Sequence, residues 1–182
     1  MSEIRNLFTD PVPTGSGTWM ANSPGTAGVS FADGQLLVQG YETTGNTFVY
    51  RSMPGMSAGD YVLSFISKSD SSPTFFGNRV CAATNGKWHI LGVVGADALN
   101  SGRALLRLTN PQQQDLNILF QAPNKASSVA YEKILLCTAE DYDAMLAAGV
   151  EWFSGDMTIR GGLPSRRLYP HVDRCCALVV VA

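Results

Sequence analysis

The feature that most constrains this chain is a regular succession of short segments rich in β-branched, aromatic and aliphatic residues. Turn formers such as Asp33-Gly34, Pro54-Gly55 and Asn110-Pro111 separate these segments. Short strands at even spacing are typical of a β-sandwich. The predicted strands are residues 29–31, 35–38, 47–53, 61–67, 78–83, 88–94, 103–109, 116–121 and 129–137.

Composition agrees with an all-β fold and excludes two classes of partner. Charged residues make up 15% of the chain, below the roughly 25% of ordinary soluble domains, while 18 glycines and 9 prolines supply many turns. A net charge of −2 without a basic run gives nucleic acid little to bind. No apolar stretch is long enough for a membrane helix, so we expect no membrane insertion.

Residues 61–67 are apolar on both faces, which predicts a central strand covered on its second face by another element or a neighbouring subunit. Asn85-Gly86 suits a two-residue hairpin, because both residues tolerate positive φ. We expect this turn to join the strands that contain Cys81 and Trp88.

Residues 129–137 predict the closing strand of the sandwich, with a short helix directly after it. Thr138 can cap this helix, and Gly149 can end it. The predicted apolar stripe of the helix consists of Tyr142, Met145 and Leu146.

The cysteines and histidines indicate neither a metal site nor an active site. Cys81, Cys137, Cys175 and Cys176 have no metal-like spacing, so we expect no metal, no disulfide and no cofactor. His89 and His171 have no Ser or Cys partner at a recognisable motif. The carboxylates could form a glycosidase pair only across a cleft, which a sequence does not show. We therefore expect a protein that is not an enzyme.

The C-terminal segment differs from the rest. Residues 1–157 predict the sandwich, and residues 158–182 predict an extended arm with a polar, glycine-bearing, basic start. The arm ends in the apolar residues Leu178, Val179, Val180 and Val181, which would promote aggregation if left unpaired. They are expected to pair with an open edge of this sandwich or, preferably, with a neighbouring copy in a homo-oligomer.

Three strands and the N-terminal segment carry a resemblance to the framework of carbohydrate-binding-module jelly rolls. The strands are Gly59-Asp60-Tyr61-Val62-Leu63-Ser64-Phe65, the strand that contains Trp88 and the late strand 129–136, and the N-terminal segment is Asn6-Leu7-Phe8-Thr9-Asp10 with Trp19 downstream. This resemblance implies an all-β jelly-roll β-sandwich. In related modules an acidic residue near the last strand can help to bind a structural calcium. Here Glu132 stands where those modules commonly have Asp.

The continuation after the last strand resembles minor tail proteins of actinobacterial phages and prophages. Gly149-Val150-Glu151-Trp152-Phe153-Ser154-Gly155-Asp156 is similar to their aromatic, Phe-Asp-Gly-Asp-like turn, although Ser154 replaces the common Asp. The whole resemblance covers residues 6–158 and implies a location in the virion, on a tail or a head. The N-terminus lacks a secretory pattern, so we expect the chain to be made and folded in the host cytoplasm.

Two functions therefore compete. One is a structural subunit of a bacteriophage particle, whose partners are other virion subunits and further copies of itself. The other is a carbohydrate-binding module that recognises a cell-surface glycan through exposed aromatic rings. The candidate glycan-binding residues are Trp19, Tyr41, Tyr50, Trp88 and Trp152. Such aromatics are more often core residues than platforms, and Trp19 is expected rather to anchor the N-terminal segment to the sandwich.

Overall fold

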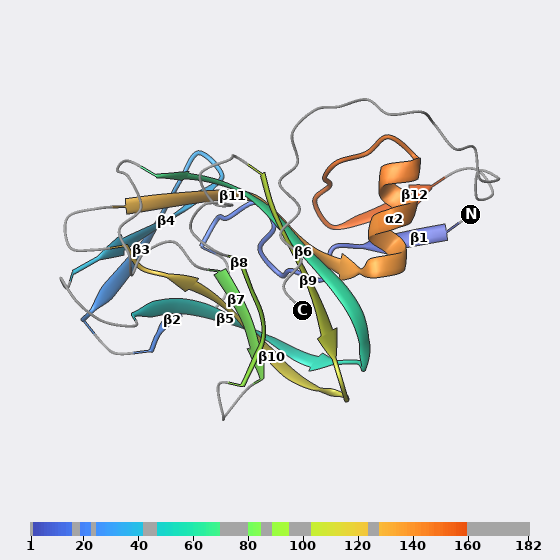
Figure 1. Ribbon diagram of the computed structural model, residues 1–182. Helices are drawn as coiled ribbons and strands as arrows, with labels where there is room; N and C mark the ends of the chain where they lie inside the picture. The colour runs from blue at the N-terminus through green and yellow to red at the C-terminus, as the bar shows by residue number, and fades with distance from the viewer. Residues whose placement is uncertain are drawn as a thin grey trace.

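The computed structural model describes residues 2–15, 19–22, 25–41, 47–69, 80–84, 89–94, 103–123 and 128–159. Within these residues the main body consists of two five-stranded antiparallel sheets (Figure 1). The β11 sheet has the order β3-β4-β11-β6-β9, and the β10 sheet has the order β2-β5-β10-β7-β8. The prediction of an all-β sandwich is confirmed.

The strands of the β11 sheet are β3 (Ala27–Ala32), β4 (Gln35–Gly40), β6 (Gly59–Ser69), β9 (Arg103–Asn110) and β11 (Ser128–Thr138). Those of the β10 sheet are β2 (Met20–Ala21), β5 (Phe48–Met56), β7 (Val80–Thr84), β8 (Ile90–Val94) and β10 (Gln114–Gln121). Each predicted strand corresponds to one of these elements, and the predicted pairing of β7 with β8 is confirmed. The Asn85-Gly86 turn lies outside the described residues.

The core fills the space between the two sheets. Inward-facing residues alternate with outward-facing ones along each strand, as in β9, where every second side chain is buried. At its centre, Tyr131 packs edge-on against Phe120 and Phe65, with ring centroids 4.8 Å and 5.7 Å away. Residues from β5, β6, β9, β10 and β11 share this apolar layer.

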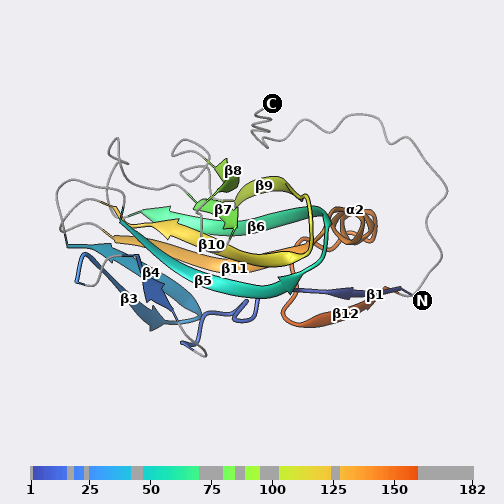
Figure 2. The ribbon, with the colours of Figure 1, turned by 90° about the horizontal axis from the view of Figure 1, so that it is seen from below.

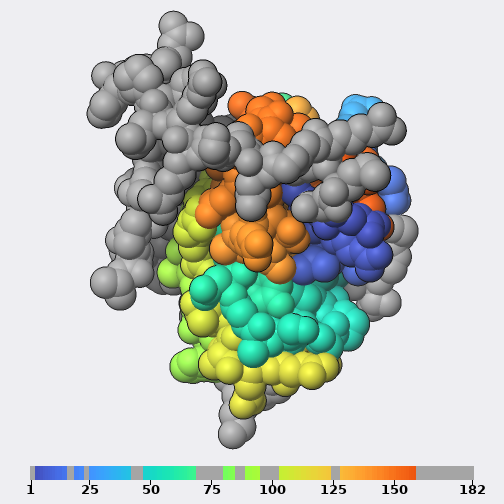
Figure 3. Space-filling model, turned by 90° about the vertical axis from the view of Figure 1, so that its right-hand side faces the viewer, coloured from blue at the N-terminus to red at the C-terminus, as the bar shows by residue number. Residues whose placement is uncertain are grey.

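A second apolar layer covers one end of the outer face of the β11 sheet. It contains helix α2 (Ala139–Ala147) and a two-stranded sheet of β1 (Ser2–Arg5) and β12 (Asp156–Ile159). Figures 2 and 3 show β1 and α2 at the same end of the molecule. Val62, Leu135 and Cys137 project into this layer from the sheet, and Met145 and Tyr142 project into it from the helix. The prediction that residues 61–67 form a covered central strand is confirmed.

The helix begins where the sequence indicates. The Thr138 hydroxyl accepts a hydrogen bond from the backbone N–H of Asp141 at 3.1 Å, as an N-cap does. Gly149 adopts a φ of +73° just after the helix, which is favourable for glycine alone. Tyr142 and Met145 are buried as predicted. Leu146 is wrongly included in the apolar stripe, because it is 47% exposed.

Two further predictions from the sequence are wrong in detail. The Pro54-Gly55 pair is not a turn between strands: β5 continues through it to Met56, with Gly55 at a φ of +64°. The opening segment also contains two short strands that the sequence did not predict, β1 and β2. Asp156 is not part of a turn, because it begins β12 and pairs with Arg5 of β1. The sequence did not predict β1, β2 and β12, because these strands are short and pair with partners that are distant in the sequence.

A β-bulge in β11 connects the sandwich to both segments that flank it. The register with β6 shifts between Glu132 and Leu135, and Lys133 has a φ of +51°. The bulge turns Ile134 out of the ladder, and its N–H donates to the carbonyl of Pro11 at 3.2 Å. Asn6 bonds to the same stretch through its side chain. The bulge is therefore the point where the N-terminal segment attaches to the sheet.

Candidate functional site

Trp19 lies against the core and not on an open face. Its ring is half-buried and lies 6.2 Å from Phe8 and from Phe31 and 5.7 Å from Phe120, between centroids. The guanidinium of Arg51 lies 5.5 Å from the centroid of the same ring. This environment gives Trp19 the position of an anchor for the N-terminal segment.

Arg51 is itself a buried charge with a buried partner. Its Nη1 lies 3.9 Å from the Asp10 carboxylate, and its Nε donates to the Thr9 hydroxyl at 2.5 Å. Burial lowers the pKa of Arg51, and the neighbouring Asp10 carboxylate opposes that shift. Asp10 also accepts hydrogen bonds from the backbone N–H groups of Thr14 and Gly15. The pair fastens the N-terminal loop to β5 and leaves no charge directed at solvent.

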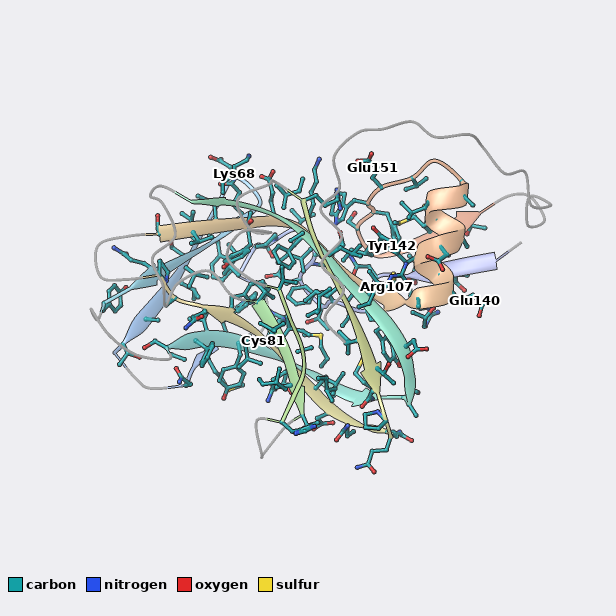
Figure 4. The ribbon with its side chains drawn as sticks, in the orientation of Figure 1. Lys68, Cys81, Arg107, Glu140, Tyr142 and Glu151 are labelled. Atoms are coloured by element: carbon teal, nitrogen blue, oxygen red, sulfur yellow. The ribbon has the colours of Figure 1, made fainter. Side chains whose placement is uncertain are left out.

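The Trp152 side chain, like that of Trp19, packs against other residues of the protein. Its indole N–H donates to the carbonyl of Ile134 at 3.4 Å, and its ring packs against the apolar layer beneath α2. On the side of the sheet near that helix, Arg107 contacts Tyr142 and bonds to Asp143 at 3.0 Å (Figure 4). Trp152 is thus positioned as part of the second apolar layer.

Tyr50 is on the outer face of the β10 sheet, where it is half-buried. Register places it opposite Leu119 of β10, which in turn lies opposite Cys81 of β7. Tyr50 and Phe48 pack against this small apolar cluster. The Tyr50 ring therefore covers buried neighbours and offers limited surface to a ligand.

Tyr41 follows β4 on the outer face of the β11 sheet and is 46% exposed. Its backbone N–H donates to the carbonyl of Thr26 at 3.0 Å, which extends the β3–β4 ladder by one bond. The hydroxyl end of its ring lies across Gly28 of β3: a Cβ at position 28 would be 2.1 Å from the Tyr41 oxygen and 2.8 Å from Cζ. Tyr41 is the exposed aromatic side chain among the predicted site residues that the structure describes.

Gly28 and Gln39 share this outer face with Tyr41. Gln39 lies opposite Gly28 on one side and opposite Ser128 of β11 on the other. Farther along the sheet, Glu132 accepts a hydrogen bond from Gln35 at 2.8 Å and pairs with Lys68 at 3.2 Å. These contacts, the Gln35 bond foremost, lower the pKa of Glu132 although its partial burial opposes the shift. Figure 4 shows Lys68 projecting away from the sandwich.

The remaining predicted site residues cannot be placed. Trp88 and the apolar residues Leu178, Val179, Val180 and Val181 lie outside the described residues, as do Cys175 and Cys176.

Cys81 and Cys137 are buried thiols, and burial raises the pKa of Cys137 to about 12. Within the described ranges no group of three or more His, Cys, Asp or Glu could hold a metal ion. No helix in those ranges is long and apolar enough to cross a membrane.

Sequence reasoning singled out Tyr41 but missed its two neighbours, Gly28 and Gln39. A glycine inside a strand was the available signal for Gly28, because it often marks a close approach by another group. Gln39 gave no signal by itself. Its position depends on the register of three strands, which the sequence does not reveal.

Comparisons with known proteins identify the fold. No protein-family model matches the chain, and no curated protein matches it by sequence. A solved structure described as "CBM4 structure and function" superposes with a TM-score of 0.51 at 17% identity, over 66% of this chain and 94% of that one. The chain therefore has the jelly-roll β-sandwich fold of a carbohydrate-binding module.

Two other solved structures share this similarity. The Stig cyclase Fisc from Fischerella sp. TAU, in complex with (3Z)-3-(1-methyl-2-pyrrolidinylidene)-3H-indole, gives a TM-score of 0.52 at 12% identity, over 75% of this chain and 98% of that one. The N-terminal cellulose-binding domain of Cellulomonas fimi β-1,4-glucanase C gives 0.47 at 13% identity, over 66% and 88%. The fold that this chain shares with the CBM4 structure is thus also similar to that of a cyclase.

Proposed function

We propose that this protein is a non-enzymatic glycan-binding module that contacts its ligand through Tyr41. The observation that carries the proposal is the exposure of Tyr41, 46%, on an outer sheet face of a jelly-roll sandwich. An aromatic ring binds a sugar by packing against the apolar C–H face of the pyranose, and nearby amides bond to the hydroxyl groups. Gln39 supplies such an amide on the same face.

Binding of the purified protein to a glycan array tests this proposal, with Tyr41→Ala as the matched variant. We expect the wild type to bind a defined set of glycans and the variant to lose about tenfold or more in affinity, which is about 1.4 kcal/mol. Leu146→Ala is the control, since Leu146 is equally exposed but lies on α2. A wild-type protein that binds no glycan on a broad array would overturn the proposal.

The absence of catalysis is part of the same proposal. His89 is exposed at the start of β8, and its carbonyl accepts a bond from Thr84, so it belongs to the hairpin. Among the described residues of this sheet face, Gln39 and Ser128 carry no charge, and the Glu132–Lys68 pair lies farther along the sheet. Incubation of a bound oligosaccharide with the protein, followed by mass spectrometry, is expected to return the oligosaccharide unchanged.

The module is further proposed to be a structural component of a phage particle, on a tail or a head. Support comes from the sequence resemblance at residues 149–156 and from the apolar residues that end the chain, Leu178, Val179, Val180 and Val181. We expect the full chain to form a homo-oligomer and a chain without residues 175–182 to be smaller but folded. Light scattering measures both masses, and equal masses would contradict the assembly role.

A further inference from the structure

We infer that Gly28, Gln39 and Ser128 complete a single sugar subsite around Tyr41, in which Gly28 sets the position of the ring. The inference rests on the proposed glycan binding and adds the residues that shape the site and the class of sugar that fits. The three residues lie in one row across β3, β4 and β11, as the strand register shows.

The role of Gly28 depends on its lack of a side chain. The three atoms nearest to a hypothetical Cβ at this position all belong to Tyr41, at 2.1 Å, 2.8 Å and 3.2 Å. Its backbone conformation needs no glycine, because its φ lies outside the left-handed region. The close approach of the tyrosine is therefore what requires a glycine at position 28. Any side chain there would lift the ring away from the sheet.

The seated ring leaves its outer surface available beside a polar row. Gln39 is exposed and directly opposite Gly28, so it shares the outer sheet face with the residue that the Tyr41 ring covers. Ser128 follows on β11, opposite Gln39. The carboxamide of Gln39 carries both a donor and an acceptor, so a pyranose placed on the ring could form with it the bonds that fix the orientation of a sugar.

The chemistry of the row selects a neutral sugar. Its members from β3, β4 and β11 carry no charge. Lys68 lies opposite Ala130, beyond this row, and is already paired with Glu132 at 3.2 Å. Among the described residues, a uronic or sialic acid would find no unpaired cation in this row, so we expect a preference for uncharged hexose or N-acetylhexosamine units.

Titration calorimetry with tetrasaccharides of glucose, N-acetylglucosamine and galacturonate tests the subsite. We expect Gly28→Ala to weaken binding of a neutral tetrasaccharide about tenfold and Gln39→Ala about fivefold, with little binding of galacturonate by any form. Ser30→Ala is the matched control: Ser30 is exposed on β3, opposite Leu37, and its change is expected to leave affinity within about twofold. In the Tyr41→Ala background, Gly28→Ala should have no further effect, because Gly28 acts through the ring.

Proton NMR of the free protein provides a readout that does not depend on a sugar. The α-protons of Gly28 should be displaced by the Tyr41 ring current and return to ordinary positions in Tyr41→Ala. Equal Gly28 shifts in both proteins would overturn the positioning role. An unchanged affinity in Gly28→Ala, or a preference for galacturonate, would overturn the subsite and leave glycan binding itself standing. Failure of every glycan to bind the wild type would overturn both.

Discussion

The side-chain amide of Asn6 donates a hydrogen bond to the carbonyl of Ile134, 128 residues away, at 2.9 Å. The same side chain donates to the carbonyl of Phe153 at 3.1 Å and accepts from the N–H groups of Phe8 and Leu136. One asparagine thus joins the N-terminal segment, the bulged strand and the loop before β12. The bulge makes this possible, because it takes the Ile134 backbone out of the β6 ladder.

Asn6→Ala is expected to lower the free energy of unfolding by about 2–3 kcal/mol, since it removes four hydrogen bonds and leaves partly buried backbone groups unpaired. Urea denaturation followed by fluorescence measures the loss. Asn22→Ala is the control, because Asn22 is exposed and its Oδ1 accepts an exposed bond from the N–H of Phe48. Similar losses in the two variants would contradict the role assigned to Asn6.

Met145→Ala is expected to cost about 2–4 kcal/mol, because Met145 is fully buried beneath α2 and its truncation leaves a cavity. The adjacent Leu146→Ala is expected to cost less than about 0.5 kcal/mol, because that side chain is 47% exposed. Thermal unfolding of both variants measures the difference. If the two changes cost the same, the helix does not pack on the sheet as described.

Tyr131→Phe is expected to leave stability unchanged or to raise it by about 1 kcal/mol. The Tyr131 hydroxyl is buried and has no hydrogen-bond partner among the described residues, so its removal relieves a desolvation cost. Burial also raises the pKa of this hydroxyl. Tyr61→Phe is the opposite case, since the Tyr61 hydroxyl donates to the carbonyl of Ser57 at 2.9 Å and its loss should cost about 1 kcal/mol. Chemical denaturation separates them, and a destabilised Tyr131→Phe would show that its hydroxyl has a partner.

Glu132 is expected to make stability depend on pH in the acid range. Its folded-state pKa lies below the ordinary value of 4.5, so its contribution is complete above that value and is lost as the pH falls through the folded pKa. The unfolding free energy of Glu132→Gln should therefore decline less steeply than that of the wild type between about pH 5 and pH 3. The difference is expected to be only roughly 0.5 kcal/mol, because Lys68 is exposed and solvent screens the ion pair. Gln35→Ala should flatten the decline in the same direction. An unchanged acid profile in both variants would remove Glu132 as the cause.

Much of the sandwich could be predicted from the sequence, because alternation and turn residues are local signals. The strands β3 to β11 and the Thr138 cap follow from such signals. The pairing of β1 with β12 could not, since the two strands are separated by most of the chain. The course of β5 through Pro54-Gly55 depends on its pairing with β10, whose register shifts opposite that point.

The candidate site shows the same division. A list of aromatics could be drawn from the sequence, but burial distinguishes Tyr41 from Trp19 and Trp152, and burial depends on the tertiary fold. The fit of Tyr41 over Gly28 joins residues on two strands. The sequence contains both residues without indicating that they touch.

The pairing of β1 with β12 also places both strands at one end of the sandwich. Residues 2–5 and 156–159 lie together near the helix that follows β11, whereas Tyr41 lies beside Gln39 and Ser128 at the opposite end of that strand. The eleven residues of β11 span about 35 Å at 3.3 Å per residue. A tether at either of these paired strands therefore holds one pole of the sandwich and presents the tyrosine at the other.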